Sequence, residues 1–523
     1  MSTIELRDYQ FDHFNGLANI FSKSIFAIDT SSMRRGKSYV AYKIFQELGF
    51  SSSIVICPAT VVSVWQNIDS TFKSNPMAIN SYESWRSIKG NQPKHGYLTR
   101  KGDEFEVTEK FLSLLDNGLL FICDEFQKIK NKSDQYYAVK AAIQAITSKG
   151  GMNRILLLSG TPIDKEEQAI NLLELLGIIS NPKLFKFHSR EERLELLGAK
   201  ELYEYCLQID KEKTKQLLRE HPFSVKNSVH ICYLLYVNII HPPISSAMPQ
   251  EEIENSIPLD VKNLYVILRP QDEIKYNNLV DAMGKATKYN PITKKTSLKE
   301  LNWTSFTTWL KNLENVMVYS YVRKAIEELE SNPNCKVILS FNYNSSIRSA
   351  LKNLKDYNPL LLNGSIIKED RASIIRKFQK PDLEYRLIIT NLKVVSLGIS
   401  FEDLDGRFPR IAYGSANYSA MDMLQWVSRF HSKDTKGTEP VKVRFLFGKS
   451  QQPLKSILNS IIRKSKVFKE TLLMQVSYGF KFQDDYANEE EEDTENFDKI
   501  NFIETTDPIE KNELENIEII EEL

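Results

Sequence analysis

Short apolar runs that alternate with amphipathic stretches constrain the fold of this chain most strongly. Within the first 180 residues these runs, each bounded by polar or turn residues, are SIFAID (24–29), SSIVICP (52–58), LLFICDE (119–125) and RILLLSG (154–160). A strand that is apolar throughout buries both faces, as strands do in a parallel sheet covered by helices. The alternation therefore predicts a doubly wound α/β domain over residues 1–180.

The same alternation returns in the second half of the chain. Between the halves, the spacing of Leu, Glu and Lys predicts a mostly helical insertion over residues 181–257. A second α/β domain over residues 258–475 is then indicated by apolar runs at 264–270, 335–341, 385–390, 410–414 and 441–447. Residues 286–318 fit neither pattern. The expected fold class is α/β, with two parallel-sheet domains in tandem.

The formal net charge of zero hides an asymmetry. Residues 484–523 hold 17 acidic residues and two lysines, a net −15, so the preceding 483 residues carry +15. A basic body suits a polyanionic partner. We expect residues 476–523 to be an acidic, disordered tail. Three roles of the tail remain open: it can keep the protein soluble, dock on a basic protein partner, or compete with nucleic acid for the basic cleft.

Cysteine usage and hydropathy indicate an intracellular, soluble protein. The five cysteines stand far apart without a Cys-x-x-Cys pair, which suits a reducing compartment. No apolar run approaches the ~20 residues of a membrane helix. The first residues lack the pattern of a signal peptide. We therefore expect no role at a membrane.

The segment after the first apolar run predicts a nucleotide site. TSSMRRGKS (30–38) joins that run to an amphipathic stretch. In phosphate-loop geometry, backbone N–H groups at a helix N-terminus face the phosphates, Lys37 reaches the β- and γ-phosphates, and Ser38 ligates Mg²⁺. The full pattern has Gly at position 31, where this chain has Ser31.

Two later strand ends carry matching chemistry. Asp124 and Glu125 end the third run, where Asp124 can hold Mg²⁺ and Glu125 can polarise an attacking water. An acidic strand end is also common in α/β proteins. The fourth run ends in SGTP (159–162). Each segment alone is a weak signal, and their joint order is the strong one.

In that order the three segments resemble the first motor domain of superfamily 2 helicases and translocases. LRDYQ (6–10) is similar to the adenine-side motif of that family. ICPATVVSVW (56–65) and INSYESW (79–85) resemble its motifs that contact a nucleic-acid strand. DEFQKIKN (124–131) resembles the form found in the Swi/Snf-like branch.

The second domain carries partner motifs of the same family. The segments KVILSF (336–341) and LLNGSIIKEDRASIIRKF (361–378) resemble its first two. TNLKVVSLGISFEDLDGRFPR (390–410) is similar to helicases of large cytoplasmic DNA viruses. QWVSRFHS (425–432) resembles a motif written Gln-x-x-Gly-Arg-x-x-Arg, in which Gln425 and Arg429 match while Ser428 and Ser432 replace Gly and the last Arg.

The resemblance implies two RecA-like domains that face each other across an ATP cleft, with ATP and Mg²⁺ as cofactors and nucleic acid as the partner, DNA favoured over RNA. It implies catalytic roles for Asp124, Glu125, Gln425 and Arg429. Nucleotide contacts are implied for Arg7, Gln10, Ser32, Gly36, Lys37 and Ser38.

Contacts to a nucleic-acid backbone are implied for Thr60, Ser81, Ser365 and Thr390. Each of these four hydroxyl residues fits a turn or capping role equally well. Trp65, Trp85 and Trp426 lie within motifs, and we expect them in the core rather than stacked on bases.

We therefore expect an ATP-dependent helicase or translocase, viral and linked to transcription or genome handling, in the host cytoplasm or the virion. A degenerate motor with weak or no ATPase activity, acting as a nucleic-acid-binding scaffold, is the alternative. Ser31, Arg34 and Ser432 motivate it because they depart from the family's pattern. An arginine that reaches the γ-phosphate can contribute ~10³–10⁵ in rate in related enzymes.

Overall fold

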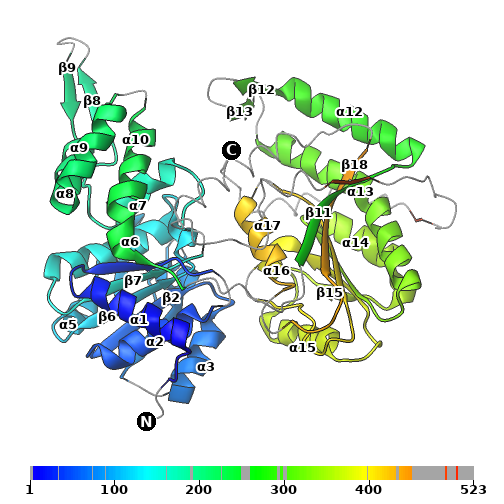
Figure 1. Ribbon diagram of the computed structural model, residues 1–523, viewed down its shortest axis with the longest axis horizontal. Coiled ribbons are helices and arrows are strands. Elements are labelled where there is room, and N and C mark those ends of the chain that lie inside the picture. Colours follow the sequence, from blue (N-terminus) through cyan, green and yellow to red (C-terminus); the bar gives the residue numbers. More distant parts are fainter. Residues whose placement is uncertain are drawn as a thin grey trace. The chain divides into compact units, whose positions relative to one another are not determined.

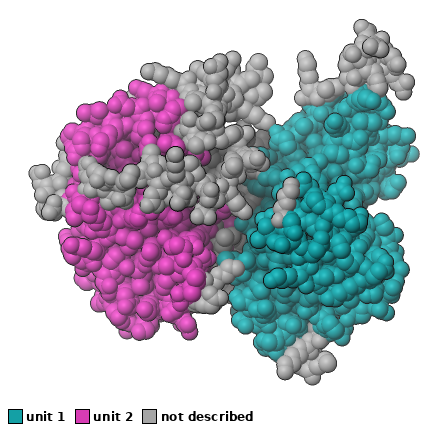
Figure 2. Space-filling model, turned by 180° about the vertical axis from the view of Figure 1, so that it is seen from behind, with its two compact units in different colours: residues 1–252, 464–478 teal, residues 253–463, 479–523 magenta. Residues whose placement is uncertain are grey.

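The computed structural model describes residues 4–449 apart from short gaps, together with residues 489–491 and 502–503. The gaps are residues 33–34, 73–74, 89, 161, 189–192, 225–226, 249–258, 291–294, 299–302, 397–398, 418 and 432–434. The chain divides into two compact units, residues 1–252 with 464–478 and residues 253–463 with 479–523 (Figure 2). Each unit has its own sheet.

The sheet of unit 1 has six strands, all parallel (Figure 1). In spatial order they are β10 (Ser245–Ser246), β1 (Phe26–Asp29), β7 (Arg154–Leu158), β6 (Leu119–Asp124), β2 (Ser52–Cys57) and β3 (Met77–Ser81). All four apolar runs predicted as strands in this region are present, as β1, β2, β6 and β7. The predicted parallel α/β architecture is therefore confirmed for unit 1.

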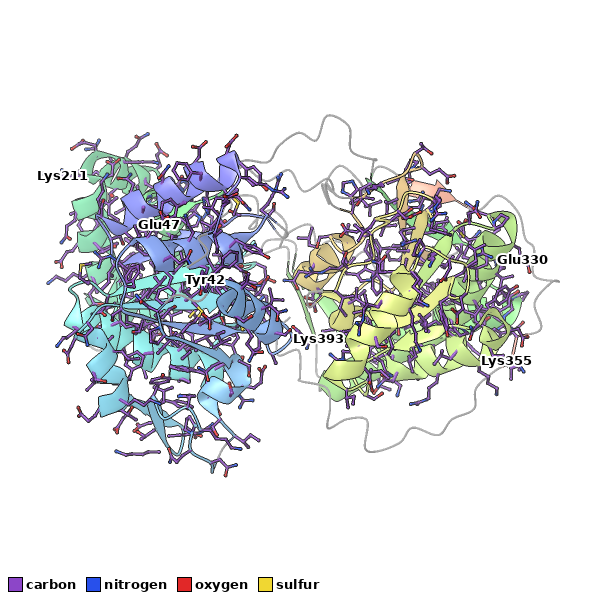
Figure 3. All side chains as sticks on the ribbon, turned by 90° about the horizontal axis from the view of Figure 1, so that it is seen from below. Tyr42, Glu47, Lys211, Glu330, Lys355 and Lys393 are labelled. Carbon is purple, nitrogen blue, oxygen red and sulfur yellow. The ribbon has the colours of Figure 1, made fainter. Side chains whose placement is uncertain are left out.

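Both faces of this sheet are buried. Phe121 and Leu157 enter one apolar cluster, and their chain neighbours Ile122 and Leu156 enter another. Tyr42 of α2 lies inside the unit, where its hydroxyl donates to Asp69 Oδ1 at 3.0 Å (Figure 3). The helices of this part are α1 (Asp8–Phe21), α2 (Lys37–Glu47), α3 (Val62–Phe72), α4 (Tyr82–Arg86), α5 (Glu109–Leu115), α6 (Asp134–Lys149) and α7 (Glu167–Leu175), with a hairpin of β4 (Leu98–Lys101) and β5 (Glu104–Val107) and a 3-10 turn, η1 (Phe126–Ile129).

After α7 the chain leaves the sheet and later returns to it. The excursion contains a hairpin, β8 (Phe185–His188) and β9 (Arg193–Leu196), then α8 (Gly198–Ile209), α9 (Lys211–Glu220), α10 (Ser228–Leu235), a π-helical turn, η2 (Tyr236–Ile240), and α11 (His241–Ile244). β10 then pairs with β1. The segment expected to be a helical insertion thus also supplies an edge strand of the sheet that carries the phosphate loop.

Unit 2 holds a seven-stranded parallel sheet. Its strands, in spatial order, are β15 (Leu360–Leu362), β16 (Leu387–Asn391), β14 (Lys336–Phe341), β17 (Arg410–Gly414), β18 (Val441–Gly448), β11 (Leu259–Val266) and β19 (Glu489–Glu491). Around it lie α12 (Pro270–Ala286), α13 (Trp303–Ser331), α14 (Asn344–Asn353), η3 (Lys355–Tyr357), α15 (Lys368–Gln379), α16 (Leu392–Ser396), α17 (Ala420–Val427) and a hairpin of β12 (Thr287–Asn290) and β13 (Lys295–Leu298).

Unit 2 differs from the sequence prediction at β11, and part of the predicted tail forms a strand. The run at 264–270 was expected to be a strand, but β11 ends at Val266 and α12 begins at Pro270. Proline suits the first turn of a helix because its missing N–H would have no partner there. Most of the tail predicted to be disordered lies outside the described residues, and three of its residues form β19 beside β11.

Two general properties of the described residues bear on function. Among the helices that the structure describes, none combines the length and the apolarity required to cross a bilayer. All five cysteines are buried and free.

Candidate nucleotide site

The phosphate loop joins β1 to α2. Gly36 caps the N-terminus of α2 with a left-handed backbone, φ +83°. A Cβ at this position would lie 2.4 Å from Nε2 of Gln10. The left-handed backbone favours glycine at position 36, and a larger residue there would also have to displace the Gln10 amide.

The loop's own carbonyl oxygens hold the ammonium of Lys37. Its Nζ donates to the backbone oxygens of Ser31 at 2.9 Å and Ser32 at 3.1 Å. Lys37 is buried, and Ser38 follows it, half-buried, in the first turn of α2. These contacts bring Ser32, Gly36, Lys37 and Ser38 together around one loop. Arg34 lies outside the described residues.

Ser31, which stands where the motif has glycine, is a structural part of the loop. Its N–H donates to Asp29 Oδ1 at 2.8 Å, and its hydroxyl accepts from the backbone N–H of Met248 at 2.8 Å. His13 Nε2 lies 3.1 Å from Asp29 Oδ2, and His13 Nδ1 lies 2.9 Å from the Ser246 hydroxyl. Through these contacts Asp29 and Ser31, at the start of the loop, are connected to α1 and to the segment around β10.

Sequence reasoning missed the pair of His13 and Asp29. Both side chains are fully buried. Burial alone would raise the pKa of Asp29, but the positive charge and hydrogen bond of His13, with Lys37 and Ser31, lower it below its ordinary value. The available signal was a single carboxylate at the end of an otherwise apolar strand, which requires a buried partner.

Gln10 connects α1 to the phosphate loop. Its Nε2 donates to the backbone oxygen of Arg35 at 2.8 Å, and its Oε1 accepts from the N–H of Arg7 at 3.1 Å. Gln10 is buried, whereas Arg7 is exposed at the N-cap of α1. The structure therefore brings the adenine-side motif to the loop. Contact of either residue with a base remains a prediction.

Asp124 ends β6 in a buried polar setting. The indole Nε1 of Trp65 donates to its Oδ2 at 2.8 Å, and the hydroxyl of Tyr82 donates to its backbone oxygen at 3.0 Å. Burial, together with the nearby charge of Glu125, raises the pKa of Asp124 to about 7, although Trp65 and Lys37 oppose the shift. A cation beside this carboxylate would relieve the cost of its buried charge.

Glu125 belongs to a chain of hydrogen bonds that links two motifs. Its backbone is left-handed, φ +53°, which turns the chain sharply out of β6. Gln127 Nε2 donates to Glu125 Oε2, and Ser159 donates its hydroxyl to Gln127 Oε1 at 2.6 Å. Ser159, just after β7, thus orients Glu125, the residue expected to polarise the attacking water, through Gln127. The sequence did not reveal this role for Gln127 and Ser159.

Strand order brings these pieces to one edge. β1, β7 and β6 are parallel neighbours, so the residues that follow them meet at the carboxyl edge of the sheet. The hydroxyl of Ser38 and the carboxylate of Asp124 are hard oxygen donors of the kind that Mg²⁺ prefers. Oδ2 of Asp124 accepts from the indole N–H of Trp65, which fixes the orientation of this carboxylate. The residues present therefore fit a magnesium ion bound with a nucleotide.

Gln425 and Arg429, from the last motif, lie within unit 2. Both are buried, one in α17 and the other just after it. The backbone N–H of Arg429 donates to the oxygen of Trp426, and its backbone oxygen accepts from Phe401. Ser432 lies outside the described residues. The catalytic roles of both residues stay predictions, because each concerns a nucleotide held by unit 1.

The four hydroxyl residues differ in their surroundings. Ser81 ends β3 and caps α4 by accepting from the N–H of Ser84 at 3.0 Å. Ser365 is exposed and donates to Asn363 Oδ1 at 2.7 Å. The Thr60 hydroxyl has no hydrogen-bond partner within the described part of the chain.

Thr390 is fully buried, and its hydroxyl lies 2.7 Å from that of Ser340 on the neighbouring strand. This geometry favours a packing role for Thr390. Trp65, Trp85 and Trp426 are fully buried, which confirms the prediction that they belong to the core.

Comparison with known proteins adds two kinds of relative. No family model matches the chain. The mimivirus protein named "Putative ATP-dependent RNA helicase L364" (Acanthamoeba polyphaga mimivirus) is 22% identical over 484 residues, 88% of this chain and 83% of that protein. The chromatin-remodeling ATPase INO80 of Mycosarcoma maydis is 28% identical over 206 residues, 36% of this chain and only 10% of that protein.

Among solved structures, the Sulfolobus solfataricus SWI2/SNF2 ATPase core in complex with dsDNA is 16% identical, with 90% of this chain and 97% of that chain covered, at a TM-score of 0.30. The ordered motifs, the two parallel sheets and the sequence similarity to the mimivirus protein and to INO80 support the resemblance of this chain to superfamily 2 helicases and translocases of the Swi/Snf-like branch.

Proposed function

We propose that this protein is an ATP-driven motor that moves along nucleic acid. The observation that supports this most is the meeting of Lys37, Asp124 and Glu125 at one edge of the sheet in unit 1. In a phosphoryl transfer the protein contributes mainly positioning and charge stabilisation, and these three side chains supply both.

Each residue has a distinct role in this proposal. The N-terminus of α2 and Lys37 bind the phosphates of ATP, with Ser32 and Gly36 shaping the loop. Ser38 and Asp124 would hold Mg²⁺, which supplies positive charge against the phosphate oxygens. Glu125, oriented by Gln127, polarises the attacking water. Gln10 and Arg7 contact the base.

We propose DNA rather than RNA as the track. The Lys-Asn pair that follows Asp-Glu-x-Gln supports DNA, because that form is typical of the Swi/Snf-like branch, and the +15 charge of the body supports binding to a polyanion. Thr60, Ser81 and Ser365 are the proposed contacts to the phosphate backbone. We also propose a viral protein that acts in transcription or genome handling, and the similarity to a mimivirus protein supports the viral part of this proposal.

A second candidate function is a degenerate motor that binds nucleic acid with little ATP hydrolysis. The burial of Arg429 within unit 2 favours it, because an arginine must reach the γ-phosphate to stabilise the transition state. The proposed motor instead requires Arg429, with Gln425, to act on the nucleotide.

The test is ATP hydrolysis measured with single- and double-stranded DNA and RNA. The wild type should be stimulated most by double-stranded DNA, and Lys37→Ala should abolish the stimulation. Lys43→Ala is the matched control, since Lys43 lies on the same helix and pairs with Glu47, which lies toward the end of that helix (Figure 3). Absence of hydrolysis in the wild type with every nucleic acid would leave the scaffold function.

A further inference from the structure

Two residues from the acidic tail lie against unit 2. The ring of Phe502 packs edge-on against Tyr319 of α13, with centroids 5.4 Å apart. The guanidinium of Arg269 lies 4.9 Å from the Phe502 ring centre and 4.2 Å from that of Tyr319. Arg269 is therefore in contact with both rings, one from the body of unit 2 and one from the tail.

The arginine is held in this position by its own unit. Its Nε donates to Asp272 Oδ2 at 2.5 Å, and its side chain is only 14% exposed. Because a side chain fixed before binding loses little further freedom, the cation and the Tyr319 ring form a preorganised surface for an aromatic residue.

Asn353, at the end of α14, binds the backbone of the next tail residue. Its Oδ1 accepts from the N–H of Ile503 at 2.6 Å, and its Nδ2 donates to the Ile503 oxygen at 3.0 Å. Nδ2 also donates to the oxygen of Ser349 at 2.8 Å, which fixes the orientation of the amide. One side chain thus satisfies both backbone groups of Ile503, as a neighbouring strand would.

The tail makes a second, upstream attachment. β19 pairs in parallel with β11, with Glu489 opposite Asn263 and Glu491 opposite Tyr265. A strand added at this position covers the edge of the sheet in unit 2. The tail thus contacts unit 2 at residues 489–491 and again at residues 502–503. Two such contacts close together in the sequence favour specific binding of the tail to unit 2.

We propose that Arg269, Tyr319 and Asn353 form a docking site for Phe502 and Ile503 of the chain's own tail. The aromatic ring inserts beside the cation, and the amide pairs with the backbone that follows. The acidic segment is therefore attached to unit 2 in cis rather than freely solvated. This proposal does not depend on ATP hydrolysis.

The experiment uses the full chain with a fluorophore on Thr505→Cys, which can be labelled selectively because the five native cysteines are buried. Label anisotropy should be high in this protein and should fall toward that of a free peptide in Phe502→Ala and Asn353→Ala. Phe497→Ala is the matched control, since Asn496-Phe497 repeats the dipeptide Asn501-Phe502 in the same tail. It should leave the anisotropy unchanged.

An unlabelled peptide of residues 496–507 should displace the labelled tail and lower the anisotropy. The Phe502→Ala form of that peptide should require an about tenfold higher concentration for the same displacement. Phe502→Ala removes no core residue of unit 2, so its effect cannot arise from unfolding. The proposal is overturned if Phe502→Ala matches the unsubstituted protein, if Phe497→Ala lowers anisotropy equally, or if the anisotropy depends on protein concentration, which would indicate a second copy as the acceptor.

Discussion

The two sheets carry different chemistry at their carboxyl edges. In unit 1 that edge holds Lys37, Asp29, Asp124 and Glu125, and three of these side chains are buried. His13 contacts Asp29 at 3.1 Å, and the nearby charge of Lys37 lowers the pKa of Asp29 and opposes the rise in the pKa of Asp124. Unit 1 therefore maintains titratable groups where they can meet a nucleotide.

In unit 2 neutral groups lie at the carboxyl ends of the central strands β14 and β16. The Ser340 hydroxyl lies 2.7 Å from that of Thr390 and accepts from the Trp426 indole at 2.8 Å. A buried carboxylate beside these strand ends, that of Glu314, accepts from the backbone N–H groups of Asn342 and Tyr343. The contrast supports the proposal that the reactive chemistry belongs to the strand ends of unit 1.

Among substitutions that test this difference between the units, Asp29→Asn should have the largest effect, a loss of stability in unit 1. Replacing the buried carboxylate that is paired with His13 costs about 3 kcal/mol, so unit 1 should unfold at a lower denaturant concentration at pH 7. The pKa of Asp29 lies below its ordinary value of 3.8. Its stabilisation is therefore fully present above about pH 4 and is lost as the pH falls through the lowered pKa.

Denaturant unfolding of wild type and variant at pH 7, 5 and 3 measures this difference. Asp116→Asn is the control, because its pair with Lys149 is exposed on both sides and contributes less than about 1 kcal/mol. A gap between wild type and Asp29→Asn that stays constant down to pH 3 would contradict the account.

An intermediate effect is expected from Ser159→Ala. The substitution removes the hydroxyl that donates to Gln127, so Glu125 loses part of its support and ATP hydrolysis should fall roughly tenfold. Steady-state kinetics should show the loss in kcat, with KM for ATP nearly unchanged. Ser70→Ala removes an exposed hydroxyl in the same unit and should change neither constant. A rise in KM alone would place Ser159 in nucleotide binding instead.

The smallest effect is expected from Thr390→Val in unit 2. The isosteric change removes the hydrogen bond to Ser340 and should cost about 1 kcal/mol of stability. Because Thr390 is fully buried, affinity for double-stranded DNA should stay within about twofold of wild type, whereas Ser365→Ala, at an exposed position, should weaken it. Loss of DNA binding in Thr390→Val would instead support a direct contact of Thr390 with the nucleic-acid backbone, as the motif resemblance implies.

The sequence predicts the sheets well because strands buried on both faces are apolar throughout. The runs that became β6 and β14 could hardly fold otherwise. The apolar pattern predicts β11 too late in the chain because the first residues of the strand, LDVKN, alternate apolar with polar, and because the apolar run extends to Pro270, which starts α12. Local patterns are weakest at such element ends.

The site residues that belong to a sequence motif could be predicted, whereas those whose roles depend on tertiary contacts could not. Lys37, Asp124 and Glu125 could be found from spacing. The partnership of His13 with Asp29 joins residues from different elements, and the serine at position 31 has a purpose only once Met248 lies beside it. Neither contact leaves a periodic signal in the sequence.

The central claim, that the edge of unit 1 hydrolyses ATP, is tested most directly by Glu125→Gln. Single-turnover hydrolysis of ATP with double-stranded DNA should occur in the wild type and fall by at least about 100-fold in the variant. The Kd for ATP should remain within a few-fold, since Lys37 and the loop are untouched. Hydrolysis by Glu125→Gln at the wild-type rate would contradict the account.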